Sequence, residues 1–400
     1  MVLKNDEAVV AWAGAEQRMP TSAARRWAKR LQRGGVALLL GSVASTAGAA
    51  AYTFTQLPSL GGTYVYASGL NNAGQVVGEA ALPGDVDTRA VVWNGGTPTN
   101  LGTIGGSYSW GSAINSVGQV AGGSATAGDV TESAVRWSGG VGTELPTLGG
   151  SYAWTMRIND AGQIAGTSSI AGDAAERATL WSASGVATDL GTLGGTNSWG
   201  IAINKLGQVA GSALTVGDAA EHAALWSGGT VTNLGTLGGS YSWANALNSA
   251  GNAVGSSAIA GDSERHATLW SSGTVTDLGT LGGSYSTAFW INELGQVTGA
   301  SYTLGDAEEH ATLWSGGSVI DLNDYLDPAL SNDGWYLAQA LAINDNGWII
   351  ANGYDGLGND VSFLLVPQAT ASVPEPGALA LTSVALAAAL GIRRRQIRAA

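Results

Sequence analysis

Cysteine is absent from the 400-residue chain, which excludes disulfides, thiolate metal sites and a cysteine nucleophile. Phenylalanine is scarce, with 3 residues against 15 tryptophans, and charged residues make up only 12% of the chain. Glycine is abundant instead, at 61 residues. This composition is too hydrophobic for a disordered protein and rich in turn formers, which favours a folded chain with many turns.

Basic residues are nearly missing from the middle of the chain. Between residues 50 and 392, six Arg and Lys stand against 27 Asp and Glu, a balance of 6 − 27 = −21. A surface this acidic repels nucleic acid and anionic lipid, because both are bound through basic patches. The sequence therefore predicts no nucleic-acid partner, whereas cations, neutral glycans and basic partners stay open.

The N-terminal segment has the order of a secretory signal. Residues 25–33 are basic, residues 36–47 are apolar, and small residues follow. This order predicts a signal peptide over residues 1–49 that is cleaved near Ala49, with Met19 as an alternative start. A membrane anchor is the alternative, but the apolar run is well below the roughly 20 residues that span a bilayer.

The C-terminal segment, residues 373–400, combines a proline motif, an apolar run and an arginine cluster. These parts are Pro374, Glu375 and Pro376, then residues 377–392, then Arg393, Arg394 and Arg395. As a helix the run would span roughly 24 Å, with the arginines on the cytoplasmic side. All three parts resemble the PEP-CTERM sorting signal, in which an exosortase processes the tail in Gram-negative bacteria that make exopolysaccharide.

That resemblance implies a secreted or cell-surface protein with an exosortase-type enzyme as a partner. It also implies that the chain meets the membrane only through this tail, before processing. An ordinary C-terminal anchor is the alternative. Residues 368–372 read as a linker between the tail and the region that precedes it.

One repeat accounts for residues 50–367. An Asn-x-x-Gly motif recurs in seven copies, the first six of them 44 or 45 residues apart, and an aromatic residue that ends a short strand follows each copy. The motif asparagines are Asn71, Asn115, Asn159, Asn204, Asn248, Asn292 and Asn344. Repetition at this period indicates one large domain built from small units.

The unit at residues 240–283 shows the internal plan of the repeat. Four stretches suit β-strands, residues 240–247, 252–258, 265–270 and 274–281, and turn residues separate them. Four strands in about 44 residues are typical of a β-propeller blade. A parallel β-helix is the alternative, but tight hairpin turns favour antiparallel blades.

The two ends of the array predict how it closes. The segment Tyr52–Gly62 matches the fourth strand of the unit, and Asp360–Pro367 matches the third. One blade is then split between the termini, so that the N-terminal strand completes the last blade and removes exposed sheet edges. We therefore expect an all-β, seven-bladed β-propeller of four-stranded blades, its ring closed by the N-terminal strand.

The repeat also carries a family resemblance. Its pattern I-N-x-x-G-Q-V-x-G, G-D-x-x-x-H-A-x-L-W and L-G-T-L-G-G is similar to the HAF repeat of extracellular proteins, over residues 52–366. The resemblance implies fold and location, because the family has no well-defined activity. The histidine of the pattern survives only at His222, His266 and His310, which argues against a required metal ligand or base.

Acidic loops are the first candidate sites. An Asp follows a Gly in six repeats, and we expect these carboxylates on one rim: Asp85, Asp129, Asp173, Asp218, Asp262 and Asp306. Calcium takes six to eight oxygen ligands, more than one Asp and one Glu per loop supply. A solvated turn is therefore favoured, Ca²⁺ binding is the alternative, and no metal or other cofactor is assigned.

Aromatic residues beside the Gly-Gly pairs are the second candidates. We expect Tyr108, Tyr152, Tyr241 and Tyr285 on the same rim as the aspartates, where aromatic faces beside carboxylates suit sugar rings. In the first strand, Tyr108, Trp110 and Ile114 should point one way, and Ser109, Gly111 and Ala113 the other. The tryptophans of these strands are expected to be core: Trp110, Trp154, Trp199 and Trp243.

Catalytic residues are not expected. Each polar residue is copied from repeat to repeat, and no Ser-His-Asp, His-Glu-x-x-His or phosphate-loop pattern occurs. The one evident break in symmetry is residues 323–340, where Asp324, Asp327 and Asp333 suit either a local site or, preferably, a capping loop.

We therefore expect a non-enzymatic protein that binds extracellular polysaccharide or surface proteins, because near-identical sites favour multivalent weak binding. A secreted propeller enzyme that cleaves glycans, as a lyase or hydrolase, is one alternative. A purely structural or protein-binding propeller is the other.

Overall fold

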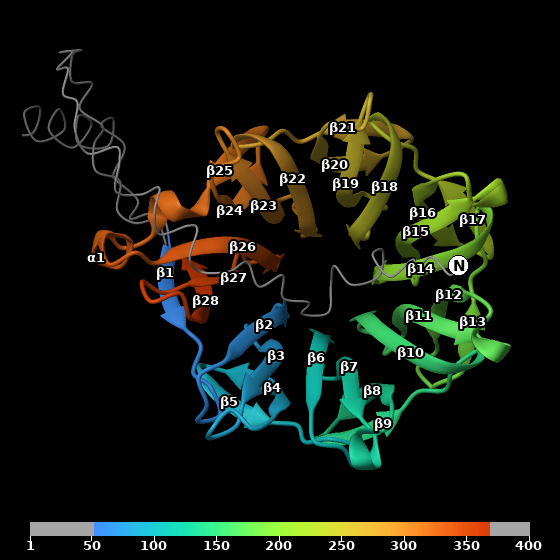
Figure 1. Ribbon diagram of the computed structural model, residues 1–400, viewed down its shortest axis with the longest axis horizontal. Helices are drawn as coiled ribbons and strands as arrows, with labels where there is room; N and C mark the ends of the chain where they lie inside the picture. Colours follow the sequence, from blue (N-terminus) through green and yellow to red (C-terminus); the bar gives the residue numbers. More distant parts are fainter. Residues whose placement is uncertain (1–51, 369–400) are drawn as a thin grey trace, which may run out of the picture. The chain divides into compact units, whose positions relative to one another are not determined.

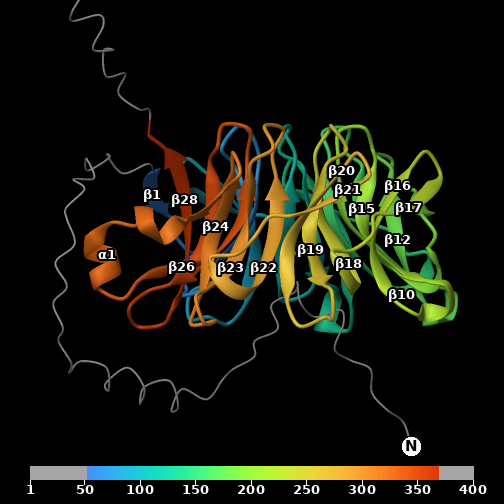
Figure 2. The same cartoon turned by 90° about the horizontal axis from the view of Figure 1, so that it is seen from above.

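The protein is described by a computed structural model over residues 52–368, and these residues form four-stranded antiparallel sheets that radiate from a central axis (Figure 1). The expected signal peptide, the linker after residue 368 and the sorting tail lie outside the described residues. The all-β prediction is confirmed. Strands run between two faces of the sheet array (Figure 2).

Each repeat supplies its four strands in chain order. The first two sheets are β2 (Val65–Leu70), β3 (Val76–Ala81), β4 (Thr88–Asn94) and β5 (Thr97–Asn100), then β6 (Ser109–Ile114), β7 (Val120–Ala125), β8 (Glu132–Ser138) and β9 (Val141–Glu144). The next two are β10 (Gly149–Ile158), β11 (Ile164–Ile170), β12 (Glu176–Trp181) and β13 (Ala187–Asp189), then β14 (Gly194–Ile203), β15 (Val209–Thr215), β16 (Glu221–Ser227) and β17 (Thr230–Asn233).

Two further repeats are joined into one eight-stranded sheet. Their strands are β18 (Gly238–Leu247), β19 (Ala253–Ile259), β20 (Arg265–Ser271) and β21 (Thr274–Asp277), then β22 (Gly282–Ile291), β23 (Val297–Thr303), β24 (Glu309–Ser315) and β25 (Ser318–Asp321). A single parallel bridge between Arg265 and Tyr285 makes the connection.

The last sheet draws on both ends of the described chain. Its strands are β26 (Tyr336–Ile343), β27 (Ile349–Tyr354), β28 (Asp360–Pro367) and β1 (Tyr52–Gln56). β1 pairs antiparallel with β28, from Tyr52 opposite Pro367 to Gln56 opposite Phe363. The N-terminal strand therefore occupies the place that the fourth strand of the repeat takes in the other sheets.

Fourth strands are shorter than the sequence indicates. In the unit at residues 240–283 the expected strand over 274–281 ends at Asp277. The Asp277 carboxylate accepts a hydrogen bond from the Gly279 amide at 2.7 Å, and Gly279 has φ +79°. This local turn redirects the chain toward the next repeat, because glycine adopts a positive φ without steric cost.

The core lies between successive sheets. The tryptophan that ends each third strand is 0–4% exposed in six repeats: Trp93, Trp137, Trp181, Trp226, Trp270 and Trp314. Five of these indoles donate to a backbone carbonyl 35 residues earlier, as Trp181 does to Pro146 at 2.7 Å. Each such bond ties the third strand to the connection that leads into its own repeat.

The expected alternation of the first strand is wrong at its end. Ala113 and Ile114 are both buried, although the pattern places them on opposite faces. The register shifts between Gly111 and Ala113, which marks a β-bulge. A bulge adds one residue to one strand and so breaks the two-residue period.

The symmetry break at residues 323–340 contains short helices that the apolar pattern does not indicate. It forms η5 (Leu322–Tyr325) and α1 (Pro328–Asn332) before β26. Asp327 caps α1 by accepting from the Ala329 amide at 2.8 Å. Tyr325 and Trp335 pack against the core of the last sheet, so this segment covers that sheet at the periphery (Figure 2). Short 3-10 turns also occur at η2 (Ala127–Asp129), η3 (Ala171–Asp173) and η4 (Val216–Asp218).

Candidate functional site

The Gly-Asp loops lie beside the starts of the first strands, as expected. In six repeats the Asp carboxylate accepts a backbone N–H from the residue after the Gly-Gly pair, at 2.6–2.7 Å, as Asp129 does from Ser107. The aspartates adopt φ of 53–55°, a left-handed conformation that Asp tolerates better than most residues. Each carboxylate therefore fastens the loop between the second and third strands to the start of the first strand of the same repeat.

These hydrogen bonds also change the acidity of the loops. The backbone N–H of Ser107 lowers the pKa of Asp129, and Ser151 and Ser240 do the same for Asp173 and Asp262. For Asp306 the Ser284 hydroxyl is the larger cause of the lowered pKa. The lowered pKa values follow from hydrogen bonds that favour the charged carboxylate. Sequence reasoning placed these aspartates correctly but did not identify their role as latches.

The rim tyrosines form ring pairs with tryptophans. Tyr108 and Trp110 stack with centroids 6.3 Å apart and planes at 19°, and tilted pairs join Tyr152 to Trp154 at 5.5 Å and Tyr241 to Trp243 at 5.0 Å. Tyr285 has Thr287 at the tryptophan position and meets Tyr302 edge-on at 6.2 Å. We call these residues the aromatic rim: Tyr108, Trp110, Tyr152, Trp154, Tyr241, Trp243 and Tyr285.

The expectation that the first-strand tryptophans are core is wrong. Trp110, Trp154, Trp199 and Trp243 are all half-buried. The ring of Trp110 lies over Gly123 of the neighbouring strand β7, where an added Cβ would come within 2.1 Å of the indole. Glycine on the second strand thus lets one ring face lie flat on the sheet. Tyr108, Tyr152 and Tyr241 are half-buried too, whereas Tyr285 is exposed at 40%.

Glutamates complete the rim, and sequence reasoning missed them. The hydroxyl of Tyr108 donates to Glu132 at 2.6 Å, and that of Tyr152 to Glu176 at 2.8 Å. Glu176 also accepts from the Trp199 indole of the next sheet at 2.6 Å. The bond to Glu132 is the main cause that raises the pKa of Tyr108 to about 12. A Glu at the start of the third strand in four repeats was the available signal: Glu132, Glu176, Glu221 and Glu309.

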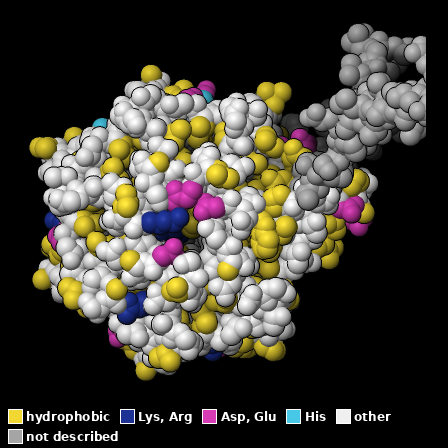
Figure 3. Space-filling view, turned by 180° about the vertical axis from the view of Figure 1, so that it is seen from behind, with side chains coloured by type: hydrophobic (Ala, Val, Ile, Leu, Met, Phe, Trp, Pro, Cys, Tyr) yellow, Lys and Arg dark blue, Asp and Glu magenta, His cyan; other side chains and the backbone are white. Residues whose placement is uncertain are grey.

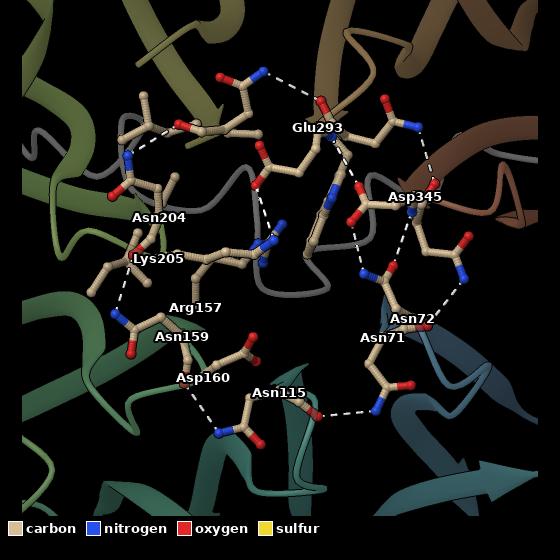
Figure 4. Close-up of a pocket in the computed structure, with 18 of the residues that line it drawn as sticks. Asn71, Asn72, Asn115, Arg157, Asn159, Asp160, Asn204, Lys205, Glu293 and Asp345 are labelled. Carbon is tan, nitrogen blue, oxygen red and sulfur yellow. Dashed lines mark hydrogen bonds and ion pairs between the residues drawn. The ribbon is translucent and has the colours of Figure 1, made fainter. Parts of the chain in front are cut away.

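A cavity of about 160 Å³ lies where the first strands end, opposite the rim (Figure 4). Around it the seven motif asparagines form an unbroken cycle of hydrogen bonds of 3.0–3.3 Å. Each side-chain amide donates to the carbonyl of the next asparagine, and Asn344 donates back to Asn71. The sequence marks these asparagines only as a repeated motif.

Two unlike side chains meet inside this cavity. Arg157 and Trp290 stand two residues before the motif asparagine, where the other repeats have Gly or Ala: Gly69, Ala113, Ala202, Ala246 and Ala342. The Arg157 guanidinium lies 4.5 Å from the Trp290 ring centroid, and the residue is only 7% exposed. Burial lowers the pKa of Arg157 to about 10. Symmetry therefore breaks at a second place besides residues 323–340.

Charged residues surround the mouth of the cavity. Lys205 pairs with Glu293 at 3.4 Å, and Asp160 and Asp345 lie beside them (Figure 4). Figure 3 shows these opposite charges gathered at the centre of the face. Asp345 accepts from the Asn72 side chain at 2.7 Å and from the Glu293 amide at 2.9 Å, and Asp160 accepts from the Ser116 amide at 2.9 Å. These bonds link neighbouring Asn-x-x-Gly turns.

The repeated histidines connect the third strand of their sheet to the fourth strand by side-chain hydrogen bonds. His310 Nδ1 lies 2.6 Å from Asp321 on the fourth strand, and the hydrogen bond to this carboxylate is the main cause that raises the pKa of His310. His266 and His222 form the equivalent hydrogen bonds, to Asp277 and Asn233 on the fourth strands of their own repeats.

Within residues 52–368, no group of three or more His, Cys, Asp or Glu side chains is arranged to hold a metal ion. In the same range, none of the helices has the length and hydrophobicity of a bilayer-crossing segment. Asp324, Asp327 and Asp333 accordingly form no metal group in the described part of the chain.

Comparison with known proteins yields structural similarity alone. No protein-family model matches the chain, and no curated protein matches it. The β-propeller domain of the Trilobed protease from Pyrococcus furiosus is similar at a TM-score of 0.48 and 9% identity, covering 77% of this chain and 99% of that domain. A putative TolB from Agrobacterium tumefaciens gives 0.40 and 11%, covering 62% and 87%. TolB from Acinetobacter baumannii gives 0.35 and 13%, covering 80% of each chain.

Proposed function

We propose that this protein is a secreted, non-enzymatic β-propeller that binds extracellular polysaccharide through its aromatic rim. The observation that carries the proposal is the repeated pairing of a Tyr ring with a Trp ring, at 5.0–6.3 Å, in three repeats. Half-exposed aromatic faces stack on the apolar faces of sugar rings, and the adjacent glutamates can accept hydrogen bonds from sugar hydroxyls. Because similar sites recur, weak binding at each one adds up by avidity.

The proposed architecture has seven blades in a closed ring. Two observations support it: the asparagine cycle, in which Asn344 donates to Asn71 at 3.1 Å, and the pairing of β1 with β28. A further bond joins the first repeat to this junction, since the Ala67 amide of β2 donates to the Ser362 hydroxyl of β28 at 3.2 Å. Closure would fix the rim sites relative to one another, which multivalent binding of a long polymer requires.

Secretion and sorting are part of the proposal. We infer cleavage near Ala49 and exosortase processing near Pro374 from the sequence of the two ends, in a Gram-negative host. Support for a tethered display comes from the described chain: Tyr52 pairs with Pro367, and Pro367 lies against Gly347 in the last Asn-x-x-Gly turn. Both ends thus leave from the side of the Asn turns, so a C-terminal tether would present the aromatic rim outward.

A protein partner is the second candidate, and one observation favours it. Large apolar side chains on the Gly-Asp loops of the same face are strongly exposed: Val86, Val130, Val216 and Leu304, at 73–81%. Exposed apolar residues gathered on one face suit a contact with another protein.

The test is simultaneous replacement of Tyr108, Tyr152, Tyr241 and Tyr285 by Ala, since single changes would be masked by the remaining copies. We expect the folded variant to lose at least tenfold in co-sedimentation with the host's own polysaccharide, on the order of the loss of one stacked ring per site. Leu206→Ala with Leu294→Ala is the matched control, because both leucines are 72% exposed on the opposite face.

Circular dichroism and melting come first, because truncating a packed aromatic side chain costs about 3–5 kcal/mol. Undiminished binding by the folded quadruple variant would rule out this rim. If the parent itself has no affinity for the polysaccharide, the protein-binding function becomes the better one.

A further inference from the structure

Arg265 is the one cation at a position of the rim that carries glutamate in four other repeats of the described chain. It begins the third strand of its repeat, where four other repeats have Glu132, Glu176, Glu221 and Glu309. The described residues contain only six Arg and Lys, so a cation at this place stands out against an acidic surface.

The surroundings of Arg265 are aromatic. Its guanidinium lies 5.5 Å from the centroid of the Trp243 ring, which itself pairs with Tyr241 at 5.0 Å. The backbone of Arg265 forms the parallel β-bridge with Tyr285 of the next sheet, and the Tyr285 ring lies 6.2 Å from the Tyr302 ring. The guanidinium thus contacts one aromatic ring of its own sheet, and a second aromatic residue stands across the bridge on the adjacent sheet.

Arg265 has donors that the described chain does not use. Within residues 52–368 no Asp or Glu oxygen lies within 4.0 Å of its nitrogens, whereas Arg89, Arg177 and Lys205 each pair with a carboxylate. Its Nε is buried and has no hydrogen-bond partner in that range. The nearby Glu309 carboxylate is engaged by the Gln339 amide at 3.3 Å. The residue is half-buried, so part of the side chain faces solvent.

We propose that Arg265, with Trp243 and Tyr285, forms an anion-binding subsite for the carboxylate of a uronic acid unit in the bound polysaccharide. This inference rests on the proposed function and names the class of sugar that one rim site takes. A guanidinium offers paired donors that match a carboxylate, and the nearby aromatic residues can hold the sugar ring that carries it. The other rim sites, with Glu in place of Arg, would take neutral units, so the subsite sets the position of an acidic unit along the chain.

The experiment compares polygalacturonate in which most carboxyl groups are methyl esters, so that acidic units stand among neutral ones, with the same polymer after reduction of its free carboxyl groups, in the presence of EDTA. The purified parent should bind the carboxylated polymer more tightly. Arg265→Gln should lose about tenfold in affinity for polygalacturonate, the usual scale for one charge-assisted contact, and nothing for the reduced polymer. Arg136→Gln is the matched control, because it removes the same charge from β8, four residues beyond Glu132, and should leave both affinities unchanged.

Several results would overturn the subsite. The first is equal affinity of the parent for both polymers, and the second is an unchanged affinity of Arg265→Gln for polygalacturonate. The third is an equal loss of affinity of Arg265→Gln for both polymers, which would indicate a packing role against Trp243. If the parent binds neither polymer nor the host's own polysaccharide, the proposed function fails as well, whereas equal binding to both leaves that function standing. Should Arg265→Gln melt below the parent, Arg265→Lys provides the second variant. It keeps the charge without the planar fork and should lose part of the preference for the carboxylated polymer.

Discussion

At the scale of single residues, the aspartates show how one side chain both builds a loop and sets a charge. Asp262 takes φ 55° and accepts the Ser240 amide at 2.7 Å, so the residue must tolerate a left-handed backbone and also supply an acceptor. Gly would satisfy the first requirement and Asn most of both, whereas Ala satisfies neither. The order of stability among these three variants separates the cost of the left-handed backbone from the loss of the hydrogen bond.

We therefore predict that Asp262→Ala lowers the urea midpoint of unfolding more than Asp262→Gly, and Asp262→Gly more than Asp262→Asn. Asp333→Ala is the control, since Asp333 has φ −82° at the end of α1. Equal midpoints for Asp262→Ala and the parent would mean that the latch does not stabilise the fold.

The hydrogen-bonded loop aspartates also predict that the stability of the fold depends on pH in the acid range. The pKa values of Asp129, Asp173, Asp262 and Asp306 are lowered by their hydrogen bonds in the folded state. A group whose folded pKa lies below its unfolded value stabilises the fold above the unfolded pKa, about 3.9 for Asp, and loses this contribution as the pH falls through the folded pKa. Urea midpoints should fall steeply below about pH 4. The quadruple Asn variant should show a flatter profile there, and an identical profile would contradict the assignment.

At the scale of elements, β1 holds the two ends of the described chain together. It pairs with β28 over five residues, and the loop after it supplies the buried Leu57 and the Pro58 carbonyl that accepts from Trp93 at 2.8 Å. The strand therefore links the last sheet to the core of the first. The connections after other fourth strands make the same link to the next repeat, as Pro146 does to Trp181, but among the described strands β1 alone also joins the two ends of that range.

Deletion of Tyr52–Leu60 should leave the last sheet with three strands and exposed edges. We expect a lower melting temperature and a broader, less cooperative transition by calorimetry. A truncated protein that melts like the parent would argue for an open solenoid instead of the proposed closed ring. Replacing Thr97–Asn100 by a Gly-Ser segment is the comparison, because it removes a fourth strand that links no termini.

At the scale of the whole molecule, Arg157 and Trp290 tie together sheets that are not neighbours. Arg157 is on β10 and Trp290 on β22, and their contact at 4.5 Å crosses the cavity on the axis. Five repeats with Gly or Ala at this position leave the space that the two long side chains fill. The pair therefore makes a contact across the cavity that the small residues of the other repeats cannot make.

A double-mutant cycle measures the energy of this contact between Arg157 and Trp290. Arg157→Ala and Trp290→Ala should each destabilise the protein, and their coupling should be about 1–2 kcal/mol, as for a desolvated cation–π pair. Urea unfolding of the four proteins provides the values. Additive losses would mean that each side chain packs against its own sheet, and the same cycle between Arg157 and the distant Trp93 should give no coupling.

The sequence alone determined the features that depend on local repetition. Four stretches per unit, the buried tryptophans of the third strands, and the placement of Gly-Asp loops beside Tyr108 and its equivalents all follow from short-range patterns. The extra strand at Tyr52–Gln56 was also readable, because it matches the fourth strand of a complete unit.

Only the tertiary structure decided which partners these residues meet. Asn71 and Asn344 are far apart in the chain, yet they share a hydrogen bond because the array brings its first and last first-strands together. The same arrangement turns two isolated exceptions to the repeat, Arg157 and Trp290, into one contact. The half-burial of Trp110 depends on Gly123 of the neighbouring strand, which leaves room for the indole ring. Whether Arg265 finds a carboxylate partner within residues 52–368 depends on the adjacent sheet, where Glu309 is engaged by Gln339. Contacts between repeats are absent from any single repeat, so a periodic sequence cannot express them; they arise when the sheets pack around the axis.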